Sequence, residues 1–204
     1  MVQARVLAGK RKPERISFED FLVQYEGIAA EWVDGEVELV SVNNLHSQMN
    51  VFLLELMSVF VRRHALGELR ADPFVMKTGP DLPGRAPDVL FISNAKLGLL
   101  RHMHFDGPGD LVVEIVSKDS RQRDRERKFS EYERGGVKEY WIVDPETRRA
   151  DFYVLEDGRY RRIEPRTGGV YVSRELPGFW IRTEWLWDIP RGDVHSEIAA
   201  GPPA

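Results

Sequence analysis

The sequence predicts an α/β protein in which helices cover a mixed sheet. Apolar residues recur at helical spacing from His46 to about Ala65, which indicates a long amphipathic helix. From that helix onward, the expected order is helix, strand, strand, strand, helix, strand. Strands bracketed by two long helices favour a helix-covered sheet over an all-β barrel.

Composition limits the classes of protein to be considered. The chain has 204 residues, of which 42% are hydrophobic and 30% charged, as expected for one globular domain. It has no cysteine, which excludes disulfides and a thiol nucleophile, and no apolar run of about 18 residues that would cross a membrane. The first residues lack an apolar leader, so a cytoplasmic protein is expected. We expect a flexible basic arm over 1–15, one domain over 16–188 and a flexible tail over 189–204.

The N-terminal part contains signals for a helix, a hairpin and the long helix. Ser17 and Asp20 have the spacing of an N-cap and its partner three residues on. Asp34 and Gly35 stand between two β-rich runs and predict a hairpin turn. The long helix then presents one apolar face made of Met49, Phe52, Leu53, Leu56 and Phe60.

Three strands are expected after Gly67, where the long helix ends. A loop over 93–109 separates the last two strands and contains His102 and His104, which are expected to be exposed loop residues rather than a metal pair. The three strands are Leu69–Thr78, Pro87–Ile92 and Asp110–Val116.

The C-terminal part is expected to contain a helix, a strand and a β meander. The helix Arg121–Arg134 should end at Gly135-Gly136, and the strand Glu139–Val143 should stop at Asp144-Pro145. Short β-like runs separated by glycine turns follow over Ala150–Trp187.

Glu114 is the most anomalous residue, because it lies inside an apolar strand where an unpaired carboxylate is costly. Val112 and Val116 should share its face of the sheet, and Val113 and Ile115 the opposite face. A strand-end carboxylate that reaches solvent or pairs with arginine is an equally good interpretation of Glu114 alone. Together with Asp88, on the neighbouring apolar strand, it would provide oxygen ligands for Mg²⁺ or Mn²⁺.

The helix after Glu114 contains a possible second half of this site. Asp124, Lys128 and Tyr132 follow one another at intervals of four residues, so they share one helical face. An exposed ion pair followed by a core tyrosine is the simpler interpretation. Four arginines in the same segment would bind a phosphate backbone if the carboxylates form a site, although such runs are more often solvated; they are Arg121, Arg123, Arg125 and Arg127.

These residues together resemble the Uma family of the PD-(D/E)xK restriction-endonuclease-like superfamily. The resemblance covers roughly residues 16–187 and is most characteristic in the run GVKEYWIVDP over 136–145. It also includes Pro87-Asp88, the strand around Glu114, and the Asp124, Lys128, Tyr132 series. Glu31 before the hairpin turn, His46, and Leu176-Pro177-Gly178 match as well.

The resemblance implies a nuclease core and assigns roles within it. Asp88 and Glu114 would bind the metal. The superfamily's usual lysine position, two residues after the glutamate, is occupied by Val116, which points to Lys128 and less strongly to Lys118. The remaining matched residues would support the site: Glu31 as a further carboxylate, His46 at its border, Asp124 positioning the lysine, and Tyr132 packing beneath it.

The function implied is hydrolysis of DNA phosphodiester bonds by an endonuclease that depends on Mg²⁺ or Mn²⁺. The net charge of −4 means that any basic footprint on DNA is local. Two alternatives remain. One is a module that binds nucleic acid or protein without cutting. The other is an assembly protein that uses Trp180, Trp185 and Trp187 as a contact surface. A homodimer is expected from the general frequency of two-fold oligomers.

Overall fold

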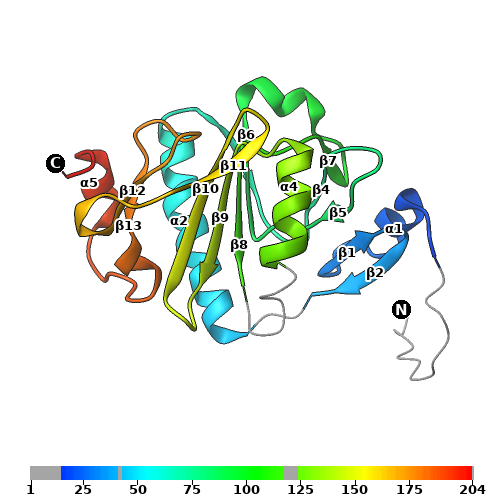
Figure 1. Cartoon of the computed structure of the whole chain (residues 1–204), viewed down its shortest axis with the longest axis horizontal. Helices are drawn as coiled ribbons and strands as arrows, with labels where there is room; N and C mark the ends of the chain where they lie inside the picture. The colour runs from blue at the N-terminus through cyan, green and yellow to red at the C-terminus, as the bar shows by residue number, and fades with distance from the viewer. Residues whose placement is uncertain (1–14, 41–42, 117–123, 204) are drawn as a thin grey trace.

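The computed structural model describes residues 15–40, 43–116 and 124–203. The described strands form a six-stranded sheet, a five-stranded sheet and a two-stranded sheet (Figure 1). The expected mixed α/β architecture is confirmed.

The six-stranded sheet has the order β11-β10-β9-β8-β6-β3. β8 and β9 run parallel, and every other neighbouring pair is antiparallel. A parallel pair requires a crossover connection, and α4 provides it between β8 and β9. The strands are β3 (Gly67–Arg70), β6 (Val89–Ser93), β8 (Leu111–Ile115), β9 (Glu139–Asp144), β10 (Arg149–Glu156) and β11 (Arg159–Ile163).

Helices cover both faces of this sheet (Figure 1). One face packs with α2 (Asn44–Arg63) and with the C-terminal elements β12 (Val170–Val172), β13 (Trp180–Arg182) and α5 (Val194–Ala199). The other face packs with α4 (Phe129–Gly135). Val113 and Ile115 belong to the first core and Val112 and Val116 to the second, so the expected alternation around Glu114 is confirmed.

The five-stranded sheet has the order β2-β1-β5-β4-β7 and is associated with the N-terminal helix. The Asp34-Gly35 hairpin is confirmed, with both residues at positive φ, and Ser17 Oγ accepts from Asp20 N at 3.0 Å as an N-cap. The elements are α1 (Phe18–Gln24), β1 (Ala30–Val33), β2 (Glu36–Leu39), β4 (Val75–Lys77), β5 (Gly84–Arg85) and β7 (His104–Asp106).

Three segments differ from the expectation. The expected strand over 69–78 is divided into β3 and β4, because Pro73 cannot donate to a strand ladder. The expected loop over 93–109 contains the 3₁₀ helix η1 (Asn94–Leu99) and β7. The tail over 189–204 contains α5, whose Val194 and Ile198 are buried in the core beside α2, so that segment is packed rather than flexible.

The tryptophans proposed as a contact surface lie mainly inside the molecule. Trp180 is 2% exposed and Trp185 is 5% exposed, and Trp187 packs against the same core. Their burial removes the surface on which the assembly interpretation depended. No helix in the described part of the chain is long and apolar enough to cross a membrane.

Candidate active site

Asp88 and Glu114 lie on adjacent strands of the six-stranded sheet. Val89 pairs with Val113 in antiparallel register, so the next step along the ladder brings Asp88 beside Glu114. Asp88 Oδ2 accepts a hydrogen bond of 2.6 Å from Ile115 N. The two carboxylates are 6% and 4% exposed, so they form a pair of buried acids.

Lys128 and Tyr132 both contact Glu114. Lys128 Nζ donates to Oε2 at 2.7 Å, and the Tyr132 hydroxyl donates to Oε1 at 2.6 Å. Burial, together with the charge on Glu114, raises the pKa of Tyr132 well above its usual value, so the hydroxyl remains a donor. The expected shared face is therefore confirmed for these two residues, although Lys128 ends a π-helical turn, η2 (Asp124–Lys128), and Tyr132 lies in α4.

Glu31, on β1 of the five-stranded sheet, contacts Lys128. Its Oε1 lies 2.9 Å from Lys128 Nζ, and its Oε2 accepts from Arg85 Nη1 at 2.8 Å. Burial by itself would raise the pKa of Glu31, but the charges of Lys128 and Arg85 lower it to about 2. Arg85 is itself fixed by two bonds of 2.7 and 2.9 Å to the carboxylate of Glu131 on α4. The anion and both cations are thus held in one buried network.

His46 lies at the beginning of α2 and contacts the other acid. Asn43 caps the helix by accepting from His46 N at 2.9 Å, which fixes this end of α2. The imidazole Nε2 then lies 2.9 Å from Asp88 Oδ1. Burial lowers the pKa of His46, but the hydrogen bond and charge of Asp88 outweigh it, so the net shift is upward. The contact with Asp88 therefore favours the protonated form of His46, which would add a third cation to Lys128 and Arg85.

Asp72 is a further acid of the cluster that the sequence did not reveal. It lies between β3 and β4, where the expected continuous strand is interrupted. Burial raises its pKa to about 6, and the negative charges of Asp88 and Glu31 contribute to the shift. Its Oδ1 atom is buried and has no hydrogen-bond partner among the described residues. The Asp-Pro pair inside a strand-like run was the available signal for a break at this point.

The donor chemistry of the cluster fits a hard divalent cation. Mg²⁺ is usually bound by one or two carboxylates together with water and substrate phosphate. Among the described residues no three Asp, Glu, His or Cys side chains gather closely enough to hold an ion by themselves. Asp72 Oδ1 is nevertheless a buried acceptor without a hydrogen-bond partner in the described structure, and an ion with its water shell would satisfy such an oxygen.

Several predicted residues cannot be assigned a place in this cluster. Arg121, Arg123 and Lys118 lie outside the described residues, as do the side chains of Asp124 and Arg125. Arg127 is half exposed and pairs with Glu38 at 3.3 Å. The expected arginine patch therefore remains a prediction.

Val116 occupies the position where the superfamily usually has its lysine. It is 1% exposed and packs in the core with Tyr132 and Tyr140. A charged side chain would be costly in that apolar setting. Lys128 places its ammonium beside Glu114 from the following helix instead.

The fold is shared with a solved structure. The crystal structure described as "a putative nuclease belonging to DUF820" from Anabaena variabilis ATCC 29413 is 15% identical and superposes with a TM-score of 0.70. The match covers 85% of this chain and 98% of that chain. The chain therefore has the α/β fold of that structure.

The sequence assigns the chain to a family within that class. The profile of the Uma2 family, described as "Putative restriction endonuclease", matches residues 18–184, and the chain belongs to this family. The resemblance drawn from the sequence is thereby confirmed. No curated protein matches the chain.

Proposed function

We propose that the protein is an endonuclease that hydrolyses DNA phosphodiester bonds with Mg²⁺ or Mn²⁺. The observation that carries the proposal is the buried contact between Lys128 and Glu114, with Asp88 beside it on the neighbouring strand. A lysine and two carboxylates held together away from water form a costly arrangement that packing alone does not require. Nuclease-like function is supported by the family and by the fold.

Asp88 and Glu114 would bind the divalent cation, and Asp72 supplies a third carboxylate nearby. When bound, such an ion lowers the pKa of a coordinated water and polarises a phosphoryl oxygen. Glu31, whose low pKa keeps it ionised, would hold the Lys128 ammonium in place. His46 would orient Asp88 through its contact with Oδ1. Tyr132 would orient Glu114 through the hydrogen bond that its hydroxyl donates.

Lys128 would stabilise the negative charge that grows on the phosphate during attack. A cation fixed in advance needs no reorganisation when that charge develops, which is the main source of electrostatic catalysis. Lys128 would also orient the attacking water and, through its positive charge, favour the loss of a proton from it. We propose that Asp124 positions this lysine and that Arg121, Arg123, Arg125 and Arg127 contact the DNA backbone, since phosphate contacts supply sequence-independent affinity.

One observation favours a second candidate, a nucleic-acid-binding module without activity. Both oxygens of Glu114 and both oxygens of Asp88 already have partners within the protein. If these bonds persist with DNA bound, the acids would only neutralise the cations beside them, and no metal ion would bind between them. The two candidates differ in whether the protein cuts DNA.

Cleavage of supercoiled plasmid and of single-stranded DNA in Mg²⁺ or Mn²⁺ tests the proposal. Glu114→Gln preserves the shape of the side chain but removes its charge, and we expect a loss of at least about 100-fold in rate. Glu164→Gln is the matched control, because that exposed glutamate pairs with Arg162 on the surface.

The outcomes separate the candidates. Cleavage by the wild type and by Glu164→Gln, but not by folded Glu114→Gln, supports the endonuclease. Undiminished cleavage by Glu114→Gln would overturn the role of this carboxylate. Salt-dependent DNA binding by wild type with no cleavage in either metal would favour the binding module.

A further inference from the structure

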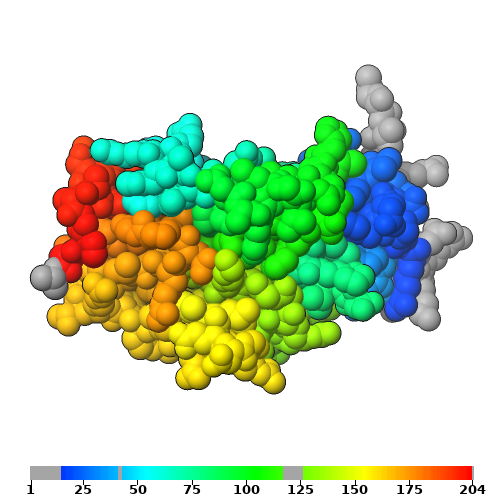
Figure 2. All heavy atoms as spheres, turned by 90° about the horizontal axis from the view of Figure 1, so that it is seen from above, coloured from blue at the N-terminus to red at the C-terminus, as the bar shows by residue number. Residues whose placement is uncertain are grey.

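One face of the five-stranded sheet carries a row of charged side chains. The strands concerned lie with α1 at one end of the molecule (Figures 1 and 2). Glu31 on β1 is directly opposite Glu38 on β2, and residues opposite each other in an antiparallel pair share a face. Trp32 pairs with Gly84, so the next step along that ladder brings Arg85 on β5 beside Glu31, at 2.8 Å. Glu38, Glu31 and Arg85 thus form a charged row across three neighbouring strands.

The segment from η2 into α4 presents the complementary charges to the charged row. Each member of the row has a partner of opposite sign on this segment. The three pairs are Glu38–Arg127 at 3.3 Å, Glu31–Lys128 at 2.9 Å and Arg85–Glu131 at 2.7 Å. The lysine of the site is therefore the middle of three ion pairs, and we call Glu38–Arg127 and Arg85–Glu131 the outer pairs.

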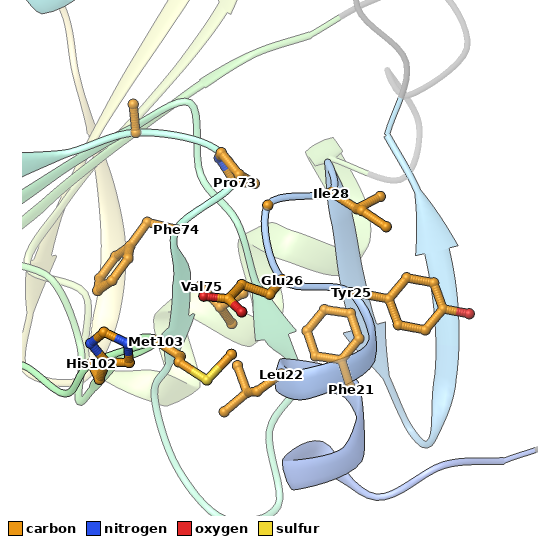
Figure 3. A pocket seen from close by; sticks show the side chains of 12 residues that line it. Phe21, Leu22, Tyr25, Glu26, Ile28, Pro73, Phe74, Val75, His102 and Met103 are labelled. Carbon is orange, nitrogen blue, oxygen red and sulfur yellow. The ribbon is translucent and has the colours of Figure 1, made fainter. Parts of the chain in front are cut away.

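The opposite face of the same sheet is apolar. Ala30 and Glu31 are neighbours along β1, so their side chains point to opposite faces. Ala30 and Val75 pack with Phe21 of α1, and the last two also line an apolar pocket of about 320 Å³ beside α1 (Figure 3). Apolar contacts thus hold α1 on this face, and the charged row serves the other contact of the sheet, with η2 and α4.

The order of the charges allows one placement of the helix on the sheet. A shift of the helix by one pair in one direction would place Lys128 against Arg85. A shift in the other direction would place Glu131 against Glu31. Both shifts bring like charges together, which is costly and is a common way to fix register at an interface. The row also sets Glu31 directly opposite Glu38, an unfavourable pair of like charges that is compensated only when the cations are in place.

We propose that the outer pairs position Lys128: they fix η2 and α4 against the five-stranded sheet and so hold the ammonium at Glu114. The inference rests on the proposed function, in which a cation fixed at this point stabilises the charge on the phosphate. A lysine ammonium ends a flexible four-carbon stem, so its place depends on what surrounds it. Arg127 has five N–H donors, so its pairing with Glu38 is compatible with the backbone contact proposed for it.

NMR of the lysine ammonium groups tests the proposal in the metal-free protein, without cleavage. A buried ammonium bonded to two carboxylates exchanges slowly with water, so the wild type should give a Lys128 cross-peak that is missing from Lys128→Met. Glu131→Gln keeps the shape of the side chain but removes the charge that faces Arg85. We expect this variant to shift and broaden the Lys128 cross-peak. Its kcat for DNA cleavage should fall about tenfold at unchanged KM, because the lysine is misplaced while the contacts to DNA remain.

Glu133→Gln is the matched control. Glu133 lies on the same helix and also pairs with an arginine, Arg159 on β11, at 2.9 Å. The loss of an ion pair that matters only for stability would affect both variants alike, whereas we expect Glu133→Gln to keep the wild-type cross-peak and kcat. Glu38→Gln, at the more exposed end of the charged row, is a second variant, and it should change the Lys128 cross-peak in the same direction but by less.

The outcomes are distinct. An unchanged Lys128 cross-peak in either folded variant would overturn the role of the pair that the variant removes, and an equal change in Glu133→Gln would overturn the role of both. A wild type without a Lys128 cross-peak would also overturn the proposal, since its ammonium would exchange freely with water. Failure of the proposed function would appear instead as a cross-peak that responds to Glu131→Gln in a protein that cuts no DNA. Cleavage by Glu131→Gln at the wild-type kcat would overturn the positioning role and leave the endonuclease standing.

Discussion

At the scale of single residues, the pKa values of two acids in the cluster are shifted in opposite directions. Two cations lower the pKa of Glu31 to about 2, so it is ionised at neutral and weakly acidic pH. Burial beside other carboxylates raises the pKa of Asp72 to about 6. Glu31 is therefore suited to fix a cation permanently, whereas Asp72 gains a proton in weakly acidic solution.

The raised pKa of Asp72 predicts how stability depends on pH. The folded pKa of about 6 exceeds the unfolded value of 3.8, so this carboxyl favours folding at low pH and lowers stability as pH rises through that range. We expect Asp72→Asn to raise the melting temperature of the metal-free protein by a few degrees at pH 7.5. The difference should shrink toward pH 4 to 5 in thermal scans.

Divalent metal provides the control for that measurement. Mn²⁺ should raise the melting temperature of the wild type more than that of Asp72→Asn, because the variant lacks one carboxylate near the ion. A variant that melts below the wild type at pH 7.5 would contradict the charge argument. An equal rise in the melting temperature of both proteins with Mn²⁺ would show that Asp72 does not contribute to metal binding.

Lys128 gives a second prediction at this scale. Lys128→Met keeps the length of the side chain but leaves Glu31 and Glu114 without their shared cation. We expect cleavage to fall by at least about 100-fold and Mn²⁺ affinity, measured by calorimetry, to rise several-fold, because the positive charge no longer opposes the ion. Lys138→Met, at a half-exposed lysine paired with Asp110, is the control. Weaker Mn²⁺ binding by folded Lys128→Met would contradict this account.

The sequence reveals only those site residues that are anomalous where they stand. Glu114 and Asp88 are recognisable because carboxylates stand in apolar strands, Lys128 is suggested by helical spacing, and the family pattern assigns their roles. Arg85 is not recognisable, since its partners Glu31 and Glu131 lie 54 and 46 residues away along the chain. Such pairs depend on how two sheets and a helix meet, which local patterns do not encode.

At the scale of elements, a buried carboxylate on β9 joins the sheet to the C-terminal part of the chain. Glu139 accepts from Trp141 Nε1 at 2.8 Å, from the Tyr171 hydroxyl at 2.8 Å and from Ser173 Oγ at 2.9 Å. The backbone N–H groups of Arg174 and Glu175 donate to it as well. This glutamate belongs to the characteristic run over 136–145, and its contacts are structural.

Glu139→Gln should destabilise the protein without altering the site. The amide has one acceptor oxygen, and its NH₂ group would face donors, so about 2–4 kcal/mol of unfolding free energy should be lost. Urea unfolding measures this loss. Cleavage per folded molecule should remain unchanged, and an unaltered unfolding midpoint would show that the buried bonds contribute little.

Elements are predictable where one local pattern determines them. The cap at Ser17, the Asp34-Gly35 turn and the apolar face of α2 are each specified within a few residues, and each was predicted. The five-stranded sheet was not predicted, because β5 has only two residues and β4 pairs with β7, which is distant along the chain. Short strands held by long-range pairing leave little periodicity to detect.

At the scale of the whole molecule, the site and the C-terminal elements lie apart. α5 packs against α2 at the end of the molecule opposite to α1 (Figures 1 and 2). Ile198 on α5 is 4% exposed, so Ile198→Ala should cost about 2–4 kcal/mol in urea unfolding. DNA cleavage below the unfolding transition should keep the wild-type rate. A reduced rate in the folded variant would indicate coupling between the two ends.

The acid network is assembled from widely separated parts of the chain, from Glu31 in the N-terminal hairpin to Lys128 and Glu131 near α4. During synthesis Glu31, Asp88 and Glu114 leave the ribosome before Lys128, which contacts Glu31 and Glu114. The site is therefore incomplete until Lys128 has emerged, and on the proposed function a shorter nascent chain should not cut nucleic acid. For the same reason, two fragments divided between β8 and η2 should each lack part of the site, and the proposed cleavage should arise only when they associate.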